Sequence, residues 1–346
     1  MASATPPQSS LNVPDVKLSA SSPSDISSFE EDGFLKVSKP VLSPMFVDEL
    51  NYALERAIRG MYDSEDGKRG GGIPDKAVKR VKMALPPPPP YESAPPPALG
   101  FSNNHQNVRT LQIVNVWKAS LPFERLVLSS ELGEFIASLT GWPSVRVVQD
   151  QTWLKPPSSQ ALAFHRDRGY FMFRSAVPFP PDEDCINGVR IVTAWIALDD
   201  MDDELGPLEY AVGSHKWQKS SHGTNPSFFE STDYRHLAHH AAAKEPPCGG
   251  EPQNTKEALT FTSMSGLPRG SMSIHDGDTY HGSGPNKSRT RCRRGVGIHY
   301  VRGDVEWDIE EAQKSKIWRR YVSDRQNTNL DDKLFPIVWP PRHGKV

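Results

Sequence analysis

One stretch constrains this chain more than any other: residues 161–173, ALAFHRDRGYFMF. It contains His165 and Asp167, a histidine and a carboxylate two residues apart. Side chains on an extended segment alternate between two faces, so we expect these two to point the same way. An imidazole and a carboxylate on one face can bind a single metal ion from two directions. Two ligands do not complete a site, so the fold must bring a third from elsewhere in the chain.

The best candidate for the third ligand is His281, far downstream in GDTYHGSGPNKS. Two basic residues, Arg293 and Arg294, follow it. Two histidines and one aspartate on one face of a metal form the facial arrangement of non-haem Fe(II) oxygenases, which leaves positions open for oxygen and a co-substrate. The predicted metal ligands, which are also the predicted catalytic residues, are therefore His165, Asp167 and His281.

Other interpretations of these histidines are weaker. A histidine two residues before an aspartate is by itself more often a hydrogen-bonded or surface pair. The letters HRD also open the kinase catalytic loop, but that loop needs an asparagine where this chain has Met172. His236, His239 and His240 have a spacing that could suit a metal, yet no further ligand pattern flanks them, which favours solvated loop residues.

Composition narrows the class of protein. The chain has 346 residues, enough for a well-buried core, and its net charge of −2 does not indicate a partner such as nucleic acid or an anionic membrane. No run of apolar residues approaches the length of a membrane span. The cysteines at 185, 248 and 292 form neither a disulfide framework nor a zinc pattern, which indicates a reducing compartment. We therefore predict a cytoplasmic protein without a nucleic-acid or membrane partner.

The apolar periodicity predicts helices followed by many short strands. Ser43 and Pro44 suit the N-cap and first position of a helix that runs to Arg59. Further helices are expected over 122–140 and 308–320, and strands over 33–37, 145–154, 190–198, 208–212, 271–275 and 295–301. Such a pattern indicates an α+β, mainly β protein: a β-sandwich or jelly roll with an added helical layer.

The chain divides into one domain and two ends. Residues 1–28 are rich in serine and proline and are expected to form a disordered tail. Residues 29–310 form the single predicted domain, with long insertions near 63–104 and 217–266, and 311–346 form a C-terminal helix and tail. Both insertions are candidates for lids that shape the substrate site, because loops on a rigid scaffold carry specificity. The basic residues over 76–82 suit either a solvated face or contact with an anionic ligand.

Five motifs in order make the chain resemble a known family. QDQTWLKPP, FHRDRGYFMFR, VTAWIALDD, GPLEYAVGSHK and GDTYHGSGPNKS with its later RRG are similar to the phytanoyl-CoA dioxygenase family of Fe(II)/2-oxoglutarate oxygenases, over about residues 30–310. The resemblance implies a double-stranded β-helix, that is, a jelly-roll or cupin-like core with flanking helices. It also implies that His165, Asp167 and His281 bind the metal.

The resemblance further implies that Arg293 grips the far carboxylate of 2-oxoglutarate, since a planar guanidinium pairs with a carboxylate through two hydrogen bonds. RTRCRRG is one residue longer than the usual spacing, so Arg291 and Arg294 remain alternatives. Arg293 and Arg294 cannot both point inward from one strand. Trp195, Ser283 and Gln151 occupy matching positions near the co-substrate, although Trp195 also suits a core residue.

The implied reaction uses Fe(II), 2-oxoglutarate and O2 to hydroxylate a small molecule, with release of succinate and CO2. Retention of Asp167 favours hydroxylation over halogenation, because related halogenases lack this carboxylate. Two alternatives stay open: a non-catalytic metal- or ligand-binding protein that keeps the jelly-roll fold, and a jelly-roll zinc protein of another reaction type. The sequence specifies neither the substrate, CoA-linked or not, nor the oligomeric state.

Overall fold

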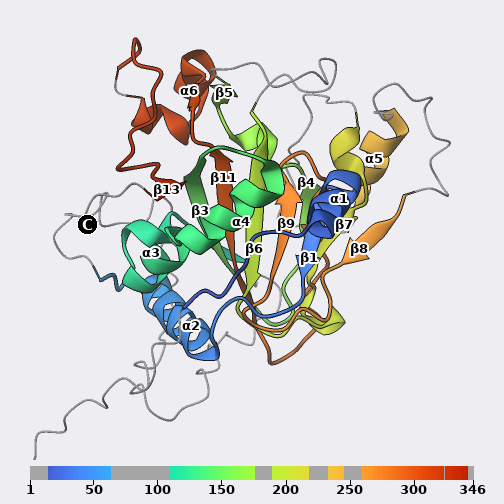
Figure 1. The fold of residues 1–346 in the computed structure, drawn as a ribbon. Coiled ribbons are helices and arrows are strands. Elements are labelled where there is room, and N and C mark those ends of the chain that lie inside the picture. The colour runs from blue at the N-terminus through green and yellow to red at the C-terminus, as the bar shows by residue number, and fades with distance from the viewer. Residues whose placement is uncertain are drawn as a thin grey trace, which may run out of the picture.

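The computed structural model describes residues 15–63, 110–175, 189–217, 233–244, 259–322 and 324–341. Two antiparallel sheets share one pocket between them, and helices cover the outer face of the larger sheet (Figure 1). This arrangement agrees with the predicted jelly roll with an added helical layer. It also places the pocket between the two sheets.

The larger sheet supplies the rigid wall of the pocket. Its strands run in the order β1, β9, β6, β11, β3 and β13, with β2 also paired to β3. Their bounds are β1 Phe34–Val37, β9 Met272–Asp276, β6 Ile191–Ala197, β11 Arg293–Arg302, β3 Val145–Lys155, β13 Ile337–Trp339 and β2 Leu111–Val114. Five of these seven strands overlap a predicted strand, whereas β2 and β13 lie where no strand is predicted.

The smaller sheet lies on the other side of the pocket. It runs β4, β10, β7, β8, and their bounds are β4 Leu162–His165, β10 His281–Ser283, β7 Leu208–Ala211 and β8 Phe261–Ser263. His281 lies directly opposite His165 in the pairing of β10 with β4. A separate two-stranded antiparallel sheet pairs β5 (Phe173–Ser175) with β12 (Val305–Trp307). The register of this sheet therefore brings together two histidines that are far apart in sequence.

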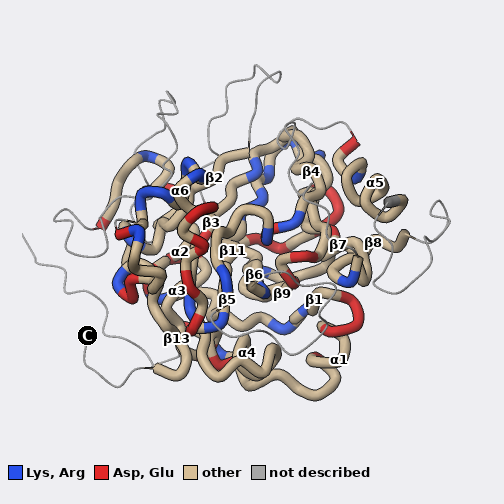
Figure 2. Tube along the Cα trace, turned by 90° about the horizontal axis from the view of Figure 1, so that it is seen from above, with Lys and Arg blue, Asp and Glu red and all other residues tan. Residues whose placement is uncertain are grey.

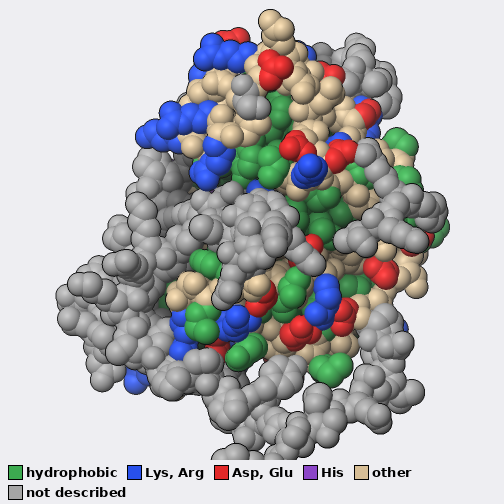
Figure 3. Space-filling view, turned by 90° about the vertical axis from the view of Figure 1, so that its left-hand side faces the viewer, with side chains coloured by type: hydrophobic (Ala, Val, Ile, Leu, Met, Phe, Trp, Pro, Cys, Tyr) green, Lys and Arg blue, Asp and Glu red, His purple; other side chains and the backbone are tan. Residues whose placement is uncertain are grey.

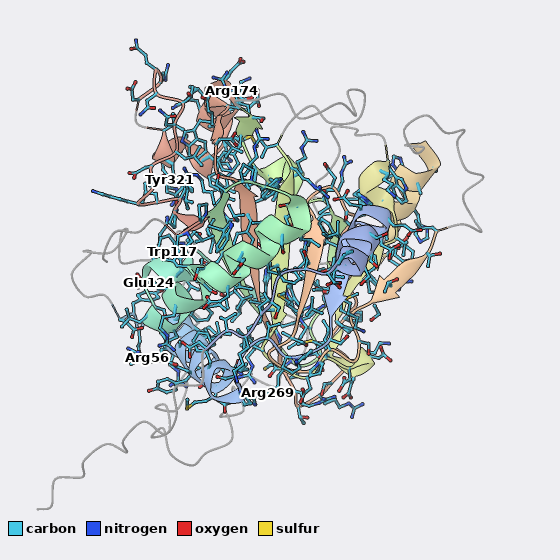
Figure 4. The ribbon with its side chains drawn as sticks, in the orientation of Figure 1. Arg56, Trp117, Glu124, Arg174, Arg269 and Tyr321 are labelled. Atoms are coloured by element: carbon cyan, nitrogen blue, oxygen red, sulfur yellow. The ribbon has the colours of Figure 1, made fainter. Side chains whose placement is uncertain are left out.

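Helices α1 to α4 pack on the larger sheet, whereas α5 packs against β4 of the smaller one. Their bounds are α1 Pro23–Asp32, α2 Pro44–Ile58, α3 Leu121–Val127, α4 Ser130–Thr140, α5 His236–Lys244 and α6 Ile309–Lys314. Ser43 caps α2 by accepting a hydrogen bond from the Phe46 amide at 3.2 Å, and Pro44 opens the helix, as predicted. Phe46 and Leu50 of α2 join Ile298 of β11 in one apolar core. In Figure 4, Arg269 lies beside α2, where its guanidinium contacts Asp48.

The described part of the expected N-terminal tail is structured. Residues 1–14 lie outside the described residues, but α1 already begins at Pro23, so the expectation of disorder is wrong over 15–28. Ser22 caps this helix by accepting from the Asp25 amide at 3.2 Å, and Phe29 is fully buried. Val16 is also buried and forms a bridge with Leu42. Two buried apolar residues are enough to hold this polar segment on the domain. Because there are only two, the composition of the segment does not reveal them.

The C-terminal segment also differs from the prediction. The expected helix over 308–320 is two pieces, α6 and a 3₁₀ turn at Trp318–Tyr321, and the tail returns to pair with β3 as β13. Trp318 packs with Trp307 and Phe335, while Lys118 lies 4.8 Å from the centre of the Tyr321 ring. Figure 4 shows Tyr321 and Trp117 on one side of the molecule. Aromatic packing thus fastens this end to the domain.

The predicted insertions are described only in part. Residues 64–109, 218–232 and 245–258 lie outside the described residues, and so does the basic stretch over 76–82. Within the second insertion, α5 forms and β8 joins the smaller sheet. His236, His239 and His240 are exposed on α5, as expected of solvated residues.

The outer surface carries charges of both signs. Figure 2 shows basic and acidic positions interspersed along the described chain. On the face drawn in Figure 3, charged and hydrophobic side chains mix, and no histidine is visible among the residues coloured there. No described helix is both long and apolar enough to cross a membrane.

Candidate metal centre

The three predicted ligands meet in the structure. His165 ends β4, His281 begins β10, and Asp167 follows two residues after β4. One possible ligand atom from each lies within 4.8 Å of the others. Asp167 Oδ1 is 3.6 Å from His165 Nε2 and 3.7 Å from His281 Nε2. Of the three side chains, that of His165 is the most exposed at 12%, so the site opens on its side.

The backbone achieves this convergence differently from the prediction. The segment is not extended through Asp167: β4 ends at His165, and Asp167 has helical angles (φ −69°, ψ −36°) at the start of a 3₁₀ turn. The same-face argument from strand alternation is therefore wrong here. A tight turn after the strand redirects the carboxylate toward the two imidazoles.

Both histidines are held in the tautomer that suits a metal. His165 Nδ1 lies 3.1 Å from the Ala163 carbonyl oxygen, and His281 Nδ1 lies 3.0 Å from that of Thr279. A carbonyl only accepts, so Nδ1 carries a hydrogen, and in the neutral ring the lone pair is then on Nε2. Burial holds the pKa of His281 well below its ordinary value, so this imidazole stays neutral. Two imidazoles that can offer Nε2, together with a carboxylate, are a suitable donor set for a divalent metal.

The second oxygen of Asp167 is fixed by the larger sheet. Thr193 Oγ1 on β6 donates to Oδ2 at 2.8 Å, and His275 Nε2 on β9 lies 3.1 Å from the same oxygen. His299 Nδ1 on β11 lies 2.8 Å from the Thr193 hydroxyl. Burial by itself would raise the pKa of Asp167, but the surrounding histidines hold it well below its ordinary value. The carboxylate is therefore ionised, with Oδ1 left toward the two histidines.

Three of these supporting residues were not among the predicted site residues. Thr193 stands in the otherwise apolar strand IVTAWIA, and His275 and His299 each follow a buried isoleucine, in MSIHD and RRGVGIHYVR. A polar side chain within an apolar strand of a two-layered protein indicates a face that does not pack on the core. For Thr193 this interruption is visible in the sequence itself.

The pocket extends from the metal centre between the two sheets. Its empty space amounts to about 460 Å³, part of which opens to solvent. The predicted residues Gln151, Trp195 and Arg293 line it together with the triad. Ser283 does not line it; its hydroxyl instead accepts a hydrogen bond from Lys155 Nζ at 2.9 Å.

Three arginines were candidates for the co-substrate carboxylate, and they differ sharply in environment. Arg293 is 1% exposed and lines the pocket, with Nη1 3.2 Å from the Gly206 carbonyl oxygen; its Nε has no hydrogen-bond partner among the described residues. Burial lowers the pKa of Arg293 to about 10. Arg294 pairs instead with Asp199, with Nε 3.0 Å from Oδ2. Arg291 is exposed and bound to acidic surface residues. Arg293 alone of the three reaches the pocket.

Two glycines allow the pocket walls to approach closely. A Cβ on Gly295 would lie 2.3 Å from the Trp195 ring, so the indole occupies the space that a side chain would fill. A Cβ on Gly282, between His281 and Ser283, would lie 2.5 Å from the Phe164 ring. The HGS segment can therefore pair with β4 only because its middle residue is glycine.

Comparison with known proteins adds a family and a fold. A family model described as phytanoyl-CoA dioxygenase (PhyH) matches residues 29–295. A curated relative from Stutzerimonas stutzeri, described as a probable α-ketoglutarate-dependent hypophosphite dioxygenase, is 26% identical over 188 residues, or 54% of each chain. The match thus spans about half the length of that relative.

Solved structures resemble the whole domain. The non-haem α-ketoglutarate-dependent carbocyclase SnoK of nogalamycin biosynthesis is 17% identical, with a TM-score of 0.57 over 92% of this chain and 96% of that one. The epimerase SnoN, solved with Fe3+, α-ketoglutarate and nogalamycin RO, is 16% identical, with a TM-score of 0.57 over 91% and 97% of the chains. EctD from S. alaskensis is 17% identical, with a TM-score of 0.51 over 84% and 82%. These likenesses confirm the predicted double-stranded β-helix fold with flanking helices.

Proposed function

The chain belongs to the phytanoyl-CoA dioxygenase family, and we propose that it is an iron(II)- and 2-oxoglutarate-dependent dioxygenase that hydroxylates a small molecule. The observation that carries this proposal is the meeting, in one pocket, of the His165, Asp167 and His281 side chains with the buried guanidinium of Arg293. A metal triad with a nearby unneutralised cation suits a ligand that has a chelating end and a carboxylate end.

Each residue has a separate role. His165 Nε2, His281 Nε2 and Asp167 Oδ1 would hold Fe(II), while Thr193 and His275 keep the carboxylate turned toward it. When bound, iron would supply the activation of O2. This activation couples oxidation of the substrate to decarboxylation of 2-oxoglutarate, which yields succinate and CO2.

The residues beyond the triad bind and orient the co-substrate. Arg293 takes its far carboxylate through paired hydrogen bonds. Trp195, whose ring centre lies 5.5 Å from the Arg293 guanidinium, limits where that group can move. Gln151 lines the pocket as a further polar contact. Asp167, retained where halogenases lack a carboxylate, supports hydroxylation as the outcome.

We also propose that the protein works in the cytoplasm on a small molecule, without a nucleic-acid or membrane partner. Sparse cysteines support the reducing compartment. Cys292 is a free thiol, and burial raises its pKa to about 12. Cys185 and Cys248 lie outside the described residues.

Anaerobic loading with Fe(II) and then 2-oxoglutarate tests the function directly. We expect a weak visible charge-transfer band in the wild-type protein. Arg293→Ala should raise the dissociation constant of 2-oxoglutarate about 100-fold, because a buried charged contact is lost. Arg294→Ala is the matched control and should keep wild-type affinity, because its side chain pairs with Asp199 outside the pocket.

Two outcomes would contradict the proposal. Bound iron without a band on addition of 2-oxoglutarate would exclude this co-substrate. A band without succinate formation, either with or without oxidation of a substrate, would instead indicate a protein that binds iron and 2-oxoglutarate without turnover.

A further inference from the structure

The pocket contains a buried polar atom that serves neither the metal triad nor Arg293. His299 is 2% exposed and lines the pocket from β11, and its Nε2 has no hydrogen-bond partner among the described residues. In the described chain, the side chains close enough to share a metal ion are His165, Asp167 and His281, so His299 stands outside that group. Burying a polar atom without a partner is costly, so such an atom in a ligand site indicates a contact that a ligand completes.

The hydrogen bonds around Asp167 determine which nitrogen of His299 carries a hydrogen. The Thr193 hydroxyl donates its only hydrogen to Asp167 Oδ2 at 2.8 Å, so Thr193 Oγ1 can only accept from His299 Nδ1, 2.8 Å away. Asp167 Oδ2, 3.5 Å from the same nitrogen, also only accepts. Burial lowers the pKa of His299 to about 4, so the ring is neutral and its one hydrogen is on Nδ1. Nε2 therefore presents a lone pair to the pocket.

Neither 2-oxoglutarate nor O2 can supply a donor for this lone pair. At neutral pH 2-oxoglutarate has two carboxylates and a keto group, all of which only accept hydrogen bonds. Its far carboxylate is assigned to Arg293, which lies six residues from His299 along β11, or about 20 Å of extended strand. O2 has no hydrogen to donate. A donor for Nε2 must therefore come from a further molecule.

His299 stands beside the metal centre rather than at the Arg293 end of the pocket. It pairs with Thr193 across the β11–β6 ladder, and Thr193 in turn contacts Asp167. The register of β11 with β3 shifts directly after His299, and a bulge of this kind often re-aims a side chain next to a site. The Phe171 ring packs against the imidazole, with its centre 5.1 Å away. A molecule that donates to Nε2 would therefore lie next to the metal centre.

We propose that His299 determines substrate specificity: its Nε2 accepts a hydrogen bond from an O–H or N–H group of the substrate, close to the atom that is oxidised. The inference rests on the proposed function, because it takes the metal centre as the place of oxidation. The substrate class is thus an alcohol, amine or amide rather than a hydrocarbon or an anion that has only acceptors. Thr193 joins this contact to Asp167, so one chain of hydrogen bonds links the substrate to a metal ligand.

The tautomer of His299 is tested by NMR on protein with isotopically labelled histidine-ring nitrogens. Zn(II) takes the place of iron, because it is diamagnetic and binds the same types of ligand, and 2-oxoglutarate is added. The variant His299→Asn identifies the signal, which disappears from its spectrum. We expect Nδ1 of His299 to carry the hydrogen and Nε2 to carry none. A hydrogen on Nε2 would overturn the proposal.

The contact itself is tested with two probes that differ in one group: cyclohexanol donates an O–H, and fluorocyclohexane has fluorine in its place. Cyclohexanol should move the Nε2 signal of His299, and fluorocyclohexane should leave it nearly unchanged. His299→Asn keeps an amide N–H for Thr193 but has no acceptor at the place of Nε2. Its affinity for cyclohexanol, measured by tryptophan fluorescence, should fall about 10-fold, and that for fluorocyclohexane should stay within about 2-fold of wild type.

Tyr300→Phe is the matched control. Tyr300 is the next residue of β11, and its buried hydroxyl also has no partner among the described residues, but its side chain lies in the apolar core beneath the helices. This variant should keep wild-type affinity for both probes. An equal fall in both variants would overturn the proposal, and so would an unchanged affinity for cyclohexanol in His299→Asn.

The wild-type titration decides the outcome if a variant does not fold. An Nε2 signal that does not respond to cyclohexanol, or responds equally to both probes, would overturn the proposal without any variant. A charge-transfer band with iron and 2-oxoglutarate, but no contact at Nε2, would reject this inference alone. Contact at Nε2 without such a band would instead reject the proposed function.

Discussion

The two faces of the larger sheet are built from the same strands but differ in chemistry. On β6, Val192 and Ile196 point into the apolar core beneath the helices, whereas Thr193 and Trp195 between them line the pocket. β11 repeats the pattern: Val296, Ile298 and Tyr300 face the helices, and Arg293, Gly297 and His299 face the pocket. The alternation of strand side chains produces both faces at once.

Burial is similar on the two faces, so burial does not distinguish a stabilising residue from a functional one. Ile298 and Val192 are fully buried, and so nearly are Arg293 and His299. Apolar side chains gain free energy when they leave water, about 25 cal/mol per Å². Polar and charged side chains lose hydration and must recover it from partners or from a ligand. The helix face should therefore control stability, and the pocket face should control binding.

The largest expected contrast is between Asp167 and Ile298. Asp167→Ala removes a ligand of the triad and should abolish succinate formation and iron binding while the fold is kept. Ile298→Ala should instead lower the free energy of unfolding by about 2–5 kcal/mol, through lost burial and a cavity. Denaturant unfolding and iron titration check both variants. Full 2-oxoglutarate turnover by Asp167→Ala would refute the site.

A sharper contrast uses adjacent residues of β6 and opposite substitutions. Thr193→Val removes the hydrogen bond to Asp167 Oδ2 at nearly constant volume. It should weaken iron binding about 10- to 100-fold, the usual effect of losing a group that orients a metal ligand. Val192→Thr buries a hydroxyl in the apolar core and should cost about 1–3 kcal/mol of stability with normal iron affinity. The division between faces would be wrong if Thr193→Val changed only stability.

The smallest contrast lies within the pocket face itself. A Cβ on Gly295 would lie 2.3 Å from the Trp195 ring, but one on Gly297 would meet nothing nearer than 3.7 Å. Gly295→Ala should lower stability by about 1–3 kcal/mol and displace the indole, which weakens 2-oxoglutarate binding several-fold. Gly297→Ala should leave stability within about 0.5 kcal/mol. Thermal unfolding and tryptophan fluorescence measure these effects, and equal destabilisation by both variants would argue against this position of Trp195.

Several elements were predictable from local pattern. Helix α2 has its capping serine and first-position proline where expected, and the apolar strands β3, β6 and β11 were found at nearly their observed bounds. Strand β4 was not assigned, and α1 was placed in a disordered tail, because each depends on a few contacts with distant segments. Local periodicity reports on such short elements only weakly.

Sequence alone determined where most of the strands of the larger sheet lie along the chain and which functional groups are available. These groups are the His165–Asp167 pair, His281 and a basic cluster downstream. Only the tertiary structure decided which of these groups meet. The register of β10 with β4 sets His281 against His165, and a turn rather than a strand aims Asp167 at them. The choice of Arg293 over Arg294 follows from which face of β11 lies over the pocket. The physical reason is that pairing between strands far apart in the chain sets these distances, and no local pattern contains them.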